Sequence, residues 1–176
     1  MVRVIVHGCN GHMGQVITRL IAEDDMVEIV AGIDVLDNRE NGYPVFVKLE
    51  ACSIEADVMI DFSSFKATNQ VIEYCRKKKL PLVLCTTGLT QEQLDKVKKT
   101  SREVALLQSA NMSLGISILL KLIQNAAKTL APAGFDMEIV ERHHKLKCDA
   151  PSGTALALAN SLNEAMEGSY HYTYDR

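Results

Sequence analysis

The sequence lacks the features of secreted, membrane-spanning and nucleic-acid-binding proteins. No uninterrupted apolar run approaches the roughly 18 residues that a membrane-spanning helix needs. The apolar start at residues 2–6 is too short for the core of a signal peptide. The formal net charge is −3, so there is no basic field to attract nucleic acid or an acidic membrane. These absences predict that neither nucleic acid nor a membrane is a partner.

The cysteines also lack the spacing of a metal or disulfide framework. There are five of them, an odd number, widely separated and without a CxxC pair. Neither a zinc site nor a set of disulfides is therefore expected. The simplest interpretation is a cytoplasmic protein with reduced thiols and no metal.

The composition that is present is typical of a globular protein. Of the 176 residues, 47% are hydrophobic and 23% are charged. This length allows one ordinary core, or one domain and part of another.

A glycine-rich turn follows a predicted strand at residues 2–6 and leads into a predicted helix. In its GxxGxxG spacing, Gly8 permits a tight turn, Gly11 lets the backbone approach a pyrophosphate, and Gly14 lets the helix pack close to the strand. An apolar i, i+3, i+4 stripe indicates the helix, whose N-terminus then faces the phosphates. The stripe consists of Met13, Val16, Ile17, Leu20 and Ile21. The pattern predicts a dinucleotide site; the alternative is a tight turn that binds no nucleotide.

A second predicted strand, residues 28–33, ends at Asp34, about 20 residues after Gly14. A carboxylate at this point would accept hydrogen bonds from the adenosine ribose hydroxyls. Asn10 stands where the commonest form of the motif has a glycine. Because asparagine tolerates a left-handed backbone, we expect the turn to survive.

Strands and helices alternate up to about residue 113. Residues 35–55 are poorly periodic, and Asp37-Asn38, Asn41-Gly42 and Pro44 within them are interpreted as turns. Ser63 or Ser64 is expected to cap one helix, and Thr90 with Gln93 forms a capping-box pattern for the next. Further strands are predicted at residues 57–60, 82–85 and 104–107, and helices at residues 65–79 and 91–101.

This alternation predicts an α/β fold with a doubly wound, mostly parallel Rossmann-type sheet. Ligands of such sheets bind beyond the carboxyl ends of the strands. Polar segments stand at every one of those predicted ends. They are the glycine turn, Asp34, residues 61–63, residues 86–88 and residues 109–112.

We assign residues 1–113 to a dinucleotide-binding domain and residues 114–176 to part of a smaller α+β substrate domain. In the latter, helices are predicted at residues 115–130 and 154–166 and a strand at residues 135–140. One strand and two helices do not make a stable domain alone. The chain is therefore expected to stop before its second domain is complete.

Residues 141–155 concentrate groups that suit a small anionic substrate. His143 and His144 are adjacent, and histidine titrates near neutral pH. Lys145 and Lys147 can supply a proton or hold an anion, and backbone N–H groups at a helix start near residues 152–154 favour anions too. The alternative interpretation is a solvated charged loop.

Taken together, these motifs resemble the 4-hydroxy-tetrahydrodipicolinate reductase (dihydrodipicolinate reductase) family of lysine and diaminopimelate biosynthesis. The resemblance covers essentially the whole chain, and its motifs occur in the same order. They are residues 8–14, 61–63, 86–88, 111–115 and 141–155. The resemblance implies hydride transfer from NADH or NADPH to a cyclic imine dicarboxylate, in an enzyme that forms homotetramers.

The resemblance also implies roles for individual residues. His143 is the proton donor or acceptor, and Lys147 is a second proton donor or a cation beside the reacting nitrogen. His144 and the backbone of Gly153 and Thr154 bind a substrate carboxylate, for which Ser152 is a further candidate. The implied cofactor contacts are Gly8, Cys9, Asn10, Gly11, His12, Met13, Asp34, Cys85, Thr86, Thr87, Ser109, Ala110, Asn111 and Met112.

Three departures from the family pattern bear on these expectations. Cys85 replaces a glycine, and its side chain is expected to narrow the approach to the nicotinamide. Val35 stands where members of dual specificity carry an arginine, which favours NADH over NADPH, although Arg39 is near. The family also continues well past Arg176, with strands that complete the substrate sheet and carry the tetramer contacts.

Two other functions remain open at this stage. A semialdehyde-type dehydrogenase needs a nucleophilic cysteine, and Cys148 is near His143. A truncated, non-catalytic nucleotide-binding fragment of the same family would bind NADH without turnover.

Overall fold

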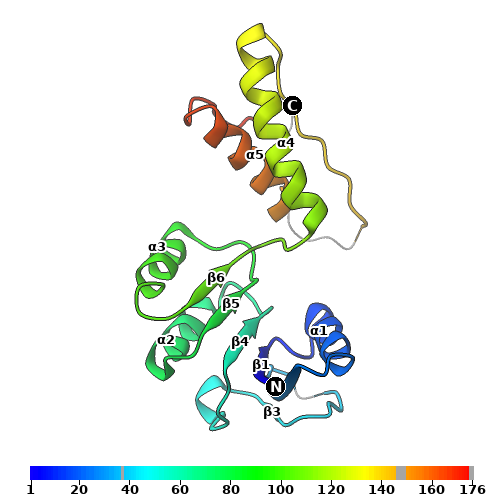
Figure 1. Ribbon diagram of the computed structural model, residues 1–176, viewed down its shortest axis with the longest axis vertical. Helices are drawn as coiled ribbons and strands as arrows, with labels where there is room; N and C mark the ends of the chain where they lie inside the picture. The colour runs from blue at the N-terminus through cyan, green and yellow to red at the C-terminus, as the bar shows by residue number, and fades with distance from the viewer. Residues whose placement is uncertain (37, 146–149, 175–176) are drawn as a thin grey trace. The chain divides into compact units, whose positions relative to one another are not determined.

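The computed structural model of the chain describes residues 1–36, 38–145 and 150–174. These residues fall into two compact units, Met1–Ala110 and Asn111–Arg176. Figure 1 shows the elements of both.

The first unit is built on a six-stranded sheet with the order β3-β2-β1-β4-β5-β6. Every neighbouring pair of strands is parallel, which confirms the predicted parallel sheet. The strands are β1 (Val2–His7), β2 (Val27–Ile33), β3 (Val45–Phe46), β4 (Val58–Asp61), β5 (Leu82–Leu84) and β6 (Leu106–Gln108).

Helices cover both faces of this sheet, as a doubly wound fold requires. They are α1 (His12–Ala22), α2 (Thr68–Lys78) and α3 (Gln91–Thr100). Figure 1 shows α1 on one side of the sheet and α2 and α3 on the other. The predicted capping box of α3 is confirmed, because Gln93 N–H donates to Thr90 Oγ1 and Thr90 N–H donates to Gln93 Oε1.

The core of this unit follows the period of two in β1. Val4 and Val6 face α1, where Ile17 and Ile21 pack against them. Ile5 points to the other face and joins the larger cluster with Val71 and Ile72 of α2. Alternate residues of one buried strand thus supply two cores, one on each side of the sheet.

One expectation for this unit is wrong. Neither Ser63 nor Ser64 caps α2, because the helix begins at Thr68 and its N-cap position is Ala67. The poorly periodic segment at residues 35–55 contains β3 and a short 3₁₀ helix, η1 (Leu49–Ala51). A two-residue strand has no period to detect, so only its pairing with β2 defines it.

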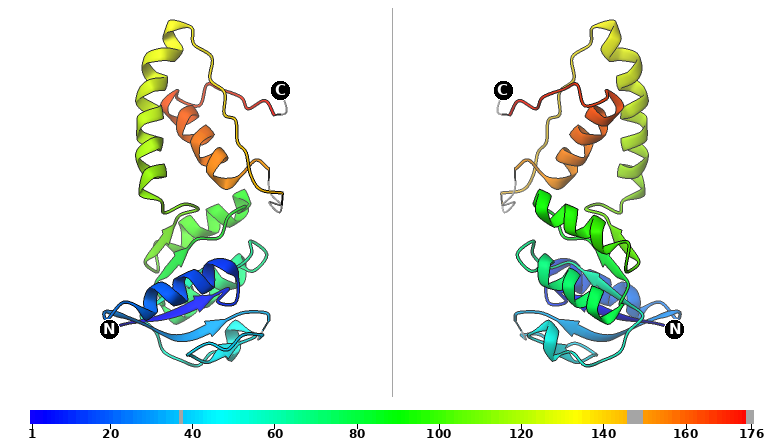
Figure 2. Two further views of the ribbon diagram at one scale, coloured as in Figure 1. Left: turned by 90° about the vertical axis from the view of Figure 1, so that its right-hand side faces the viewer. Right: turned by 90° about the vertical axis from the view of Figure 1, so that its left-hand side faces the viewer.

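The second unit consists mainly of two helices, α4 (Leu114–Leu130) and α5 (Gly153–Ala165), which lie side by side (Figure 2). A 3₁₀ turn, η2 (Ala131–Ala133), follows α4. Between the helices, Gln124 Nε2 donates to Ser161 Oγ over 2.9 Å. Ser113 and Ser152 cap the two helices, since their hydroxyls accept from Ile116 N–H and Ala155 N–H.

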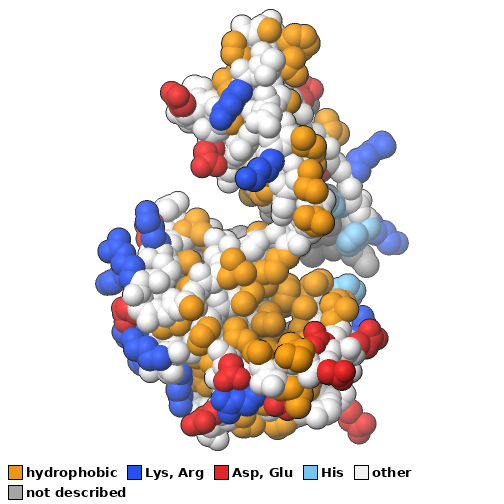
Figure 3. Space-filling model, viewed as in Figure 1, with side chains coloured by type: hydrophobic (Ala, Val, Ile, Leu, Met, Phe, Trp, Pro, Cys, Tyr) orange, Lys and Arg blue, Asp and Glu red, His pale blue; other side chains and the backbone are white. Residues whose placement is uncertain are grey.

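The predicted strand at residues 135–140 is wrong. That segment has no regular secondary structure, and the described residues of the second unit contain no strand. Strand geometry requires a hydrogen-bonded neighbour, which a run of apolar residues cannot supply by itself. Hydrophobic side chains also remain exposed along α4 (Figure 3), among them Leu114, Ile118 and Leu122.

Among the residues that the structure describes, no helix combines the length and the apolar character that crossing a membrane requires.

Candidate functional site

The strand order of the first unit reverses between β1 and β4. The chain runs from β1 outward through β2 to β3, and then continues from β4 through β5 to β6 on the other side of β1. Loops at the carboxyl ends of β1 and β4 therefore leave in opposite directions, and such a switch point is where parallel sheets bind ligands. The glycine turn follows β1 at this point.

Two glycines of the turn allow approaches that no side chain would permit. Gly8 has a φ of 80°, and a Cβ atom there would lie 2.9 Å from the carbonyl group of Phe62. A Cβ atom at Gly14 would lie 2.2 Å from the Gly8 carbonyl oxygen and 2.6 Å from Cys9 Cα. Gly14 was predicted to allow close packing against the strand; the contact it allows is with the turn itself. No side chain caps α1 at Gly11.

Asp34 joins the end of β2 to the glycine turn. Its Oδ2 accepts from Asn10 N–H over 2.9 Å, and its Oδ1 accepts from Leu36 N–H over 3.1 Å. A carboxylate has about four acceptor positions, so these bonds leave capacity for ribose hydroxyls. Asp34 was expected at this edge of the sheet, and these two bonds hold it there.

Asn10 serves the turn in a different way from the one expected. The turn survives with asparagine at this position, as predicted, but the φ of Asn10 is not positive, so left-handed backbone is not the reason. Instead, its amide Nδ2 donates to the Leu36 carbonyl, and its Oδ1 accepts from Asn41 Nδ2 over 2.9 Å. The side chain thereby ties the glycine turn to the segment after Asp34.

A buried carboxylate lies at the centre of this edge. Asp61, at the end of β4, is 0% exposed. Its Oδ1 shares a 2.6 Å hydrogen bond with His7 Nδ1 and accepts from Ser63 N–H over 3.2 Å, and its Oδ2 accepts from Thr86 Oγ1 over 2.6 Å. Burial opposes the charge, but the hydrogen bond and charge of His7, with the bonds from Ser63 and Thr86, hold the pKa of Asp61 below its ordinary value.

Sequence reasoning missed His7. His7 and Asp61 are direct partners in the register of β1 and β4, although 54 residues separate them along the chain. The available signal was a histidine at the last position of the strand, after the apolar residues Val4, Ile5 and Val6 and next to the first glycine.

The segments after β5 and β6 differ in exposure. Cys85 is buried, and this burial, with the charge of Asp61, raises the pKa of its thiol to about 11. Thr86 is buried against Asp61, whereas Thr87 is exposed.

Of the residues after β6, Ser109 and Asn111 are half-buried, and Ala110 and Met112 are exposed. Cys9 is fully buried, in its backbone as well as its side chain, while Gly11, His12 and Met13 are exposed.

In the second unit, Glu141 joins His143 to the start of α5. Its Oε1 accepts from Ser152 N–H over 2.9 Å, and its Oε2 lies 2.9 Å from His143 Nε2. The bonds from Ser152, followed by that from His143, lower the pKa of Glu141 to about 2. Sequence reasoning gave Glu141 no role. The ionised carboxylate can orient the imidazole of His143 for acid–base chemistry.

Other predicted residues of this unit lie around the start of α5. Thr154 Oγ1 accepts from Asn111 Nδ2 over 3.1 Å, so a predicted substrate contact adjoins a predicted cofactor contact. Gly153 and Thr154 are half-buried in the first turn of the helix, and His144 is exposed. Ser152 is buried with its hydroxyl engaged as the N-cap. Lys147 and Cys148 lie outside the described residues.

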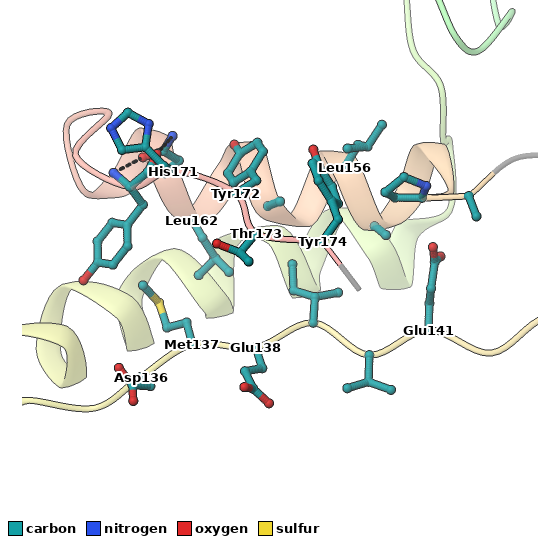
Figure 4. Close-up of a pocket in the computed structure, with 18 residues that line it drawn as sticks. Asp136, Met137, Glu138, Glu141, Leu156, Leu162, His171, Tyr172, Thr173 and Tyr174 are labelled. Carbon is teal, nitrogen blue, oxygen red and sulfur yellow. Dashed lines mark hydrogen bonds between the residues drawn. The ribbon is translucent and has the colours of Figure 1, made fainter. Parts of the chain in front are cut away.

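A groove of about 920 Å³ adjoins these residues, since Glu141 and Ala155 are part of its lining. Figure 4 shows it between residues 136–141, α5 and the tail at residues 170–174. Three carboxylates, Asp136, Glu138 and Glu141, line it, so its charge is unsuited to a dicarboxylate. Across the described residues, no group of three or more His, Cys, Asp or Glu side chains is placed to hold a metal ion.

Comparison with known proteins agrees with this geometry. The family model "Dihydrodipicolinate reductase, N-terminus" matches residues 2–112, and "Dihydrodipicolinate reductase, C-terminus" matches residues 115–174. Proteins named 4-hydroxy-tetrahydrodipicolinate reductase from Caldanaerobacter subterraneus and Clostridium tetani are 46% and 43% identical over 176 residues. Each alignment covers 100% of this chain and 69% of the relative.

Solved structures show the same likeness. The dipicolinate-bound dihydrodipicolinate reductase of Paenisporosarcina sp. TG-14 aligns with a TM-score of 0.69 and 28% identity, over 100% of this chain and 71% of that one. The myo-inositol 2-dehydrogenase of Lactobacillus plantarum aligns with a TM-score of 0.56 over 73% of this chain and 42% of that one. At 14% identity, this second match speaks for the fold alone.

Proposed function

The chain belongs to the dihydrodipicolinate reductase family, and from this membership we propose that it is an NAD(P)H-dependent oxidoreductase of lysine and diaminopimelate biosynthesis. Its reaction is the reduction of 4-hydroxy-tetrahydrodipicolinate to tetrahydrodipicolinate. The observation that carries this proposal is the glycine turn, joined to the Asp34 carboxylate at the switch point of the sheet.

The residues at this edge fit a dinucleotide cofactor. The space that a Cβ atom would fill at Gly8 and Gly14 is occupied by backbone, so the turn is shaped for close backbone approach. The Ser63 hydroxyl oxygen is buried and has no hydrogen-bond partner within the described structure, which leaves a polar group for a ligand. We assign cofactor contacts to the fourteen residues named from the family pattern.

NADH is the favoured cofactor. Asp34 carries a negative charge where the 2′-phosphate of NADPH would approach, and charge repulsion disfavours that phosphate. Val35 is 79% exposed and offers no cation to compensate. Arg39 is also exposed and lies five residues after Asp34 in the sequence, so its positive charge would relax this preference if it reached the phosphate.

Loss of the 4-hydroxyl group as water leaves a C=C bond conjugated with the C=N bond of the substrate. When bound, the reduced nicotinamide would supply a hydride to the terminal carbon of this conjugated system. The electron pairs then shift towards nitrogen, which needs a proton. His143, oriented by Glu141, donates it, and Lys147 serves as a second donor or as a cation beside the nitrogen. His144 and the backbone of Gly153 and Thr154 hold a substrate carboxylate at the N-terminus of α5. The Ser152 hydroxyl already caps this helix, so we expect Ser152 to bind an anion only through its backbone.

A second candidate function is dinucleotide binding without turnover. One observation favours it: the described part of the second unit has two α-helices and no strand, whereas the chain spans 69% of the relatives named above. A semialdehyde-type dehydrogenase would use Cys148 as its nucleophile, and alkylation of the thiol without loss of turnover would exclude this function.

The proposal is tested by titrating the purified 176-residue chain with NADH, using the fluorescence of the nucleotide. The titration is repeated with pyridine-2,6-dicarboxylate, the ligand named in the Paenisporosarcina structure. Tighter NADH binding in its presence supports both half-sites, and turnover of substrate then separates the reductase from the binding-only function. Failure to bind NADH would overturn the assignment of the glycine turn. Light scattering on the same sample measures whether the chain forms the homotetramer that the family resemblance implies. The proposed function also includes a cytoplasmic location.

A further inference from the structure

Three strand-end loops of the first unit meet at one side chain, Asp61. His7, the last residue of β1, precedes the glycine turn and is hydrogen-bonded to Oδ1. Ser63 N–H, from the loop after β4, donates to the same oxygen. Thr86, from the loop after β5, donates its hydroxyl to Oδ2. A single carboxylate is thus bonded to the end of β1, just before the glycine turn, and to the loops after β4 and β5.

Backbone bonds reinforce the same junction. Phe62 N–H donates to the His7 carbonyl over 2.9 Å, and Cys85 N–H donates to the Asp61 carbonyl over 2.9 Å. At Gly8, backbone of the first loop comes so close to Phe62 that a Cβ atom would lie 2.9 Å away. A small displacement of the loop after β4 would therefore displace the backbone of the glycine turn as well.

The carboxylate is exposed to no solvent, so protein groups must replace all of its hydration. Three donors do so, and they favour its ionised form against the opposing effect of burial. His7 is itself buried, with 7% of its surface exposed. Loss of either partner would leave a polar group unpaired in the interior, and the loops would have to move to satisfy it.

We infer that Asp61 is a positioning residue for the dinucleotide, and that His7 supports it by occupying Oδ1. Asp61 sets the distance between the glycine turn, which holds the pyrophosphate, and the Thr86 loop, which borders the nicotinamide. This inference rests on the proposed cofactor site, which it extends to two buried residues that are not among the fourteen assigned cofactor contacts.

Four single variants of the full chain test it. Asp61→Asn and His7→Leu remove a partner from the network, whereas His7→Asn retains an N–H donor near the position of Nδ1. Tyr74→Phe is the matched control, because it removes one hydrogen bond of the same unit, from the hydroxyl to the Cys52 carbonyl, that involves none of the three loops. Each variant is measured for NADH Kd by nucleotide fluorescence and for Tm with and without saturating NADH.

We expect Asp61→Asn and His7→Leu to raise the NADH Kd about tenfold or more. This is the change in Kd that corresponds to the loss of one charge-assisted hydrogen bond. We expect His7→Asn to recover binding to within about threefold of the parent chain, and Tyr74→Phe to lower Tm without changing Kd. A variant too unstable for titration is compared through its NADH-induced rise in Tm, which needs no fully folded starting sample.

Unchanged NADH binding by Asp61→Asn and His7→Leu, together with a fall in Tm like that of Tyr74→Phe, would overturn the inference and leave the proposed function intact. Equal losses for His7→Asn and His7→Leu would also overturn it, since the donor to Asp61 would then be irrelevant. Failure of the unaltered chain to bind NADH would instead overturn the proposed function.

Discussion

The two units of the chain differ in how they bury their apolar residues. In the first unit, every strand-forming run finds a neighbour, and helices close both faces of the sheet. In the described part of the second unit, Ala127 and Ala155 are the hydrophobic residues that reach full burial, while Leu114, Leu122, Phe135 and Val140 remain exposed. The contrast teaches that helical amphipathicity alone does not make a core; each apolar face needs a second layer.

This difference predicts that identical substitutions act differently in the two units. Gly14→Ala places a Cβ atom 2.2 Å from the Gly8 carbonyl oxygen, a clash with backbone that cannot be relieved by a rotamer change. We expect this variant to yield little folded protein and no NADH binding, measured by circular dichroism and nucleotide fluorescence.

Gly115→Ala is the counterpart in α4. The nearest atom to its added Cβ is Ser113 Oγ at 3.7 Å, which is an ordinary contact. Alanine in a helix is favoured over glycine by about 0.5–1 kcal/mol, so this variant should be as stable as the parent chain or slightly more stable. Equal damage from both substitutions would contradict the distinction between the two units.

Chemistry, in contrast to folding, is expected to depend on the second unit. His143→Gln removes the proposed proton donor while the side chain stays polar. We expect kcat to fall roughly 10²–10⁴-fold with NADH Kd unchanged, measured by steady-state kinetics and fluorescence titration in a preparation that turns over. Near-normal turnover would remove His143 from the proposed mechanism.

Truncating an apolar side chain is expected to cost more stability in the first unit than in the second. Ile72→Ala empties a fully buried position between α2 and the sheet, and is expected to lower the free energy of unfolding by about 2–5 kcal/mol. Leu122→Ala changes a side chain that is 59% exposed, and a change within about 0.5 kcal/mol is expected. Urea unfolding followed by circular dichroism measures both, and a larger loss at Leu122 would show that α4 is covered in solution.

The smallest expected effect is on the stability of the chain at low pH. The pKa of Glu141 is lowered from 4.5 to about 2, so between these pH values the carboxyl group is protonated in the unfolded chain and ionised in the folded chain. Its contribution to stability is therefore present above pH 4.5 and is lost as the pH falls towards 2. Glu141→Gln should flatten the pH dependence of unfolding in that window, whereas Glu164→Gln, at an exposed position of α5, should leave it unchanged. Parallel curves for parent and Glu141→Gln would contradict the assigned hydrogen bonds.

Features that depend on neighbours along the chain were predictable from the sequence. The glycine turn, the α3 capping box and the strands β1, β2, β4 and β5 follow from spacing and period within a few residues. The position of Asp34 beside the turn followed in the same way. The capping of α2 was not predictable, because Ser63 instead donates its backbone N–H to Asp61 and the helix begins four residues later than a Ser63 cap would place it.

The sequence by itself determined a parallel α/β sheet with its polar residues at the carboxyl ends of the strands, because those signals are local. Only the tertiary structure decided that His7 and Asp61 form a pair, that Asn10 is held by Asn41, and that residues 135–140 are not a strand. Each of these depends on which segments become neighbours across long separations. Register between parallel strands, and the presence or absence of a pairing partner, are set by the packing of the whole unit.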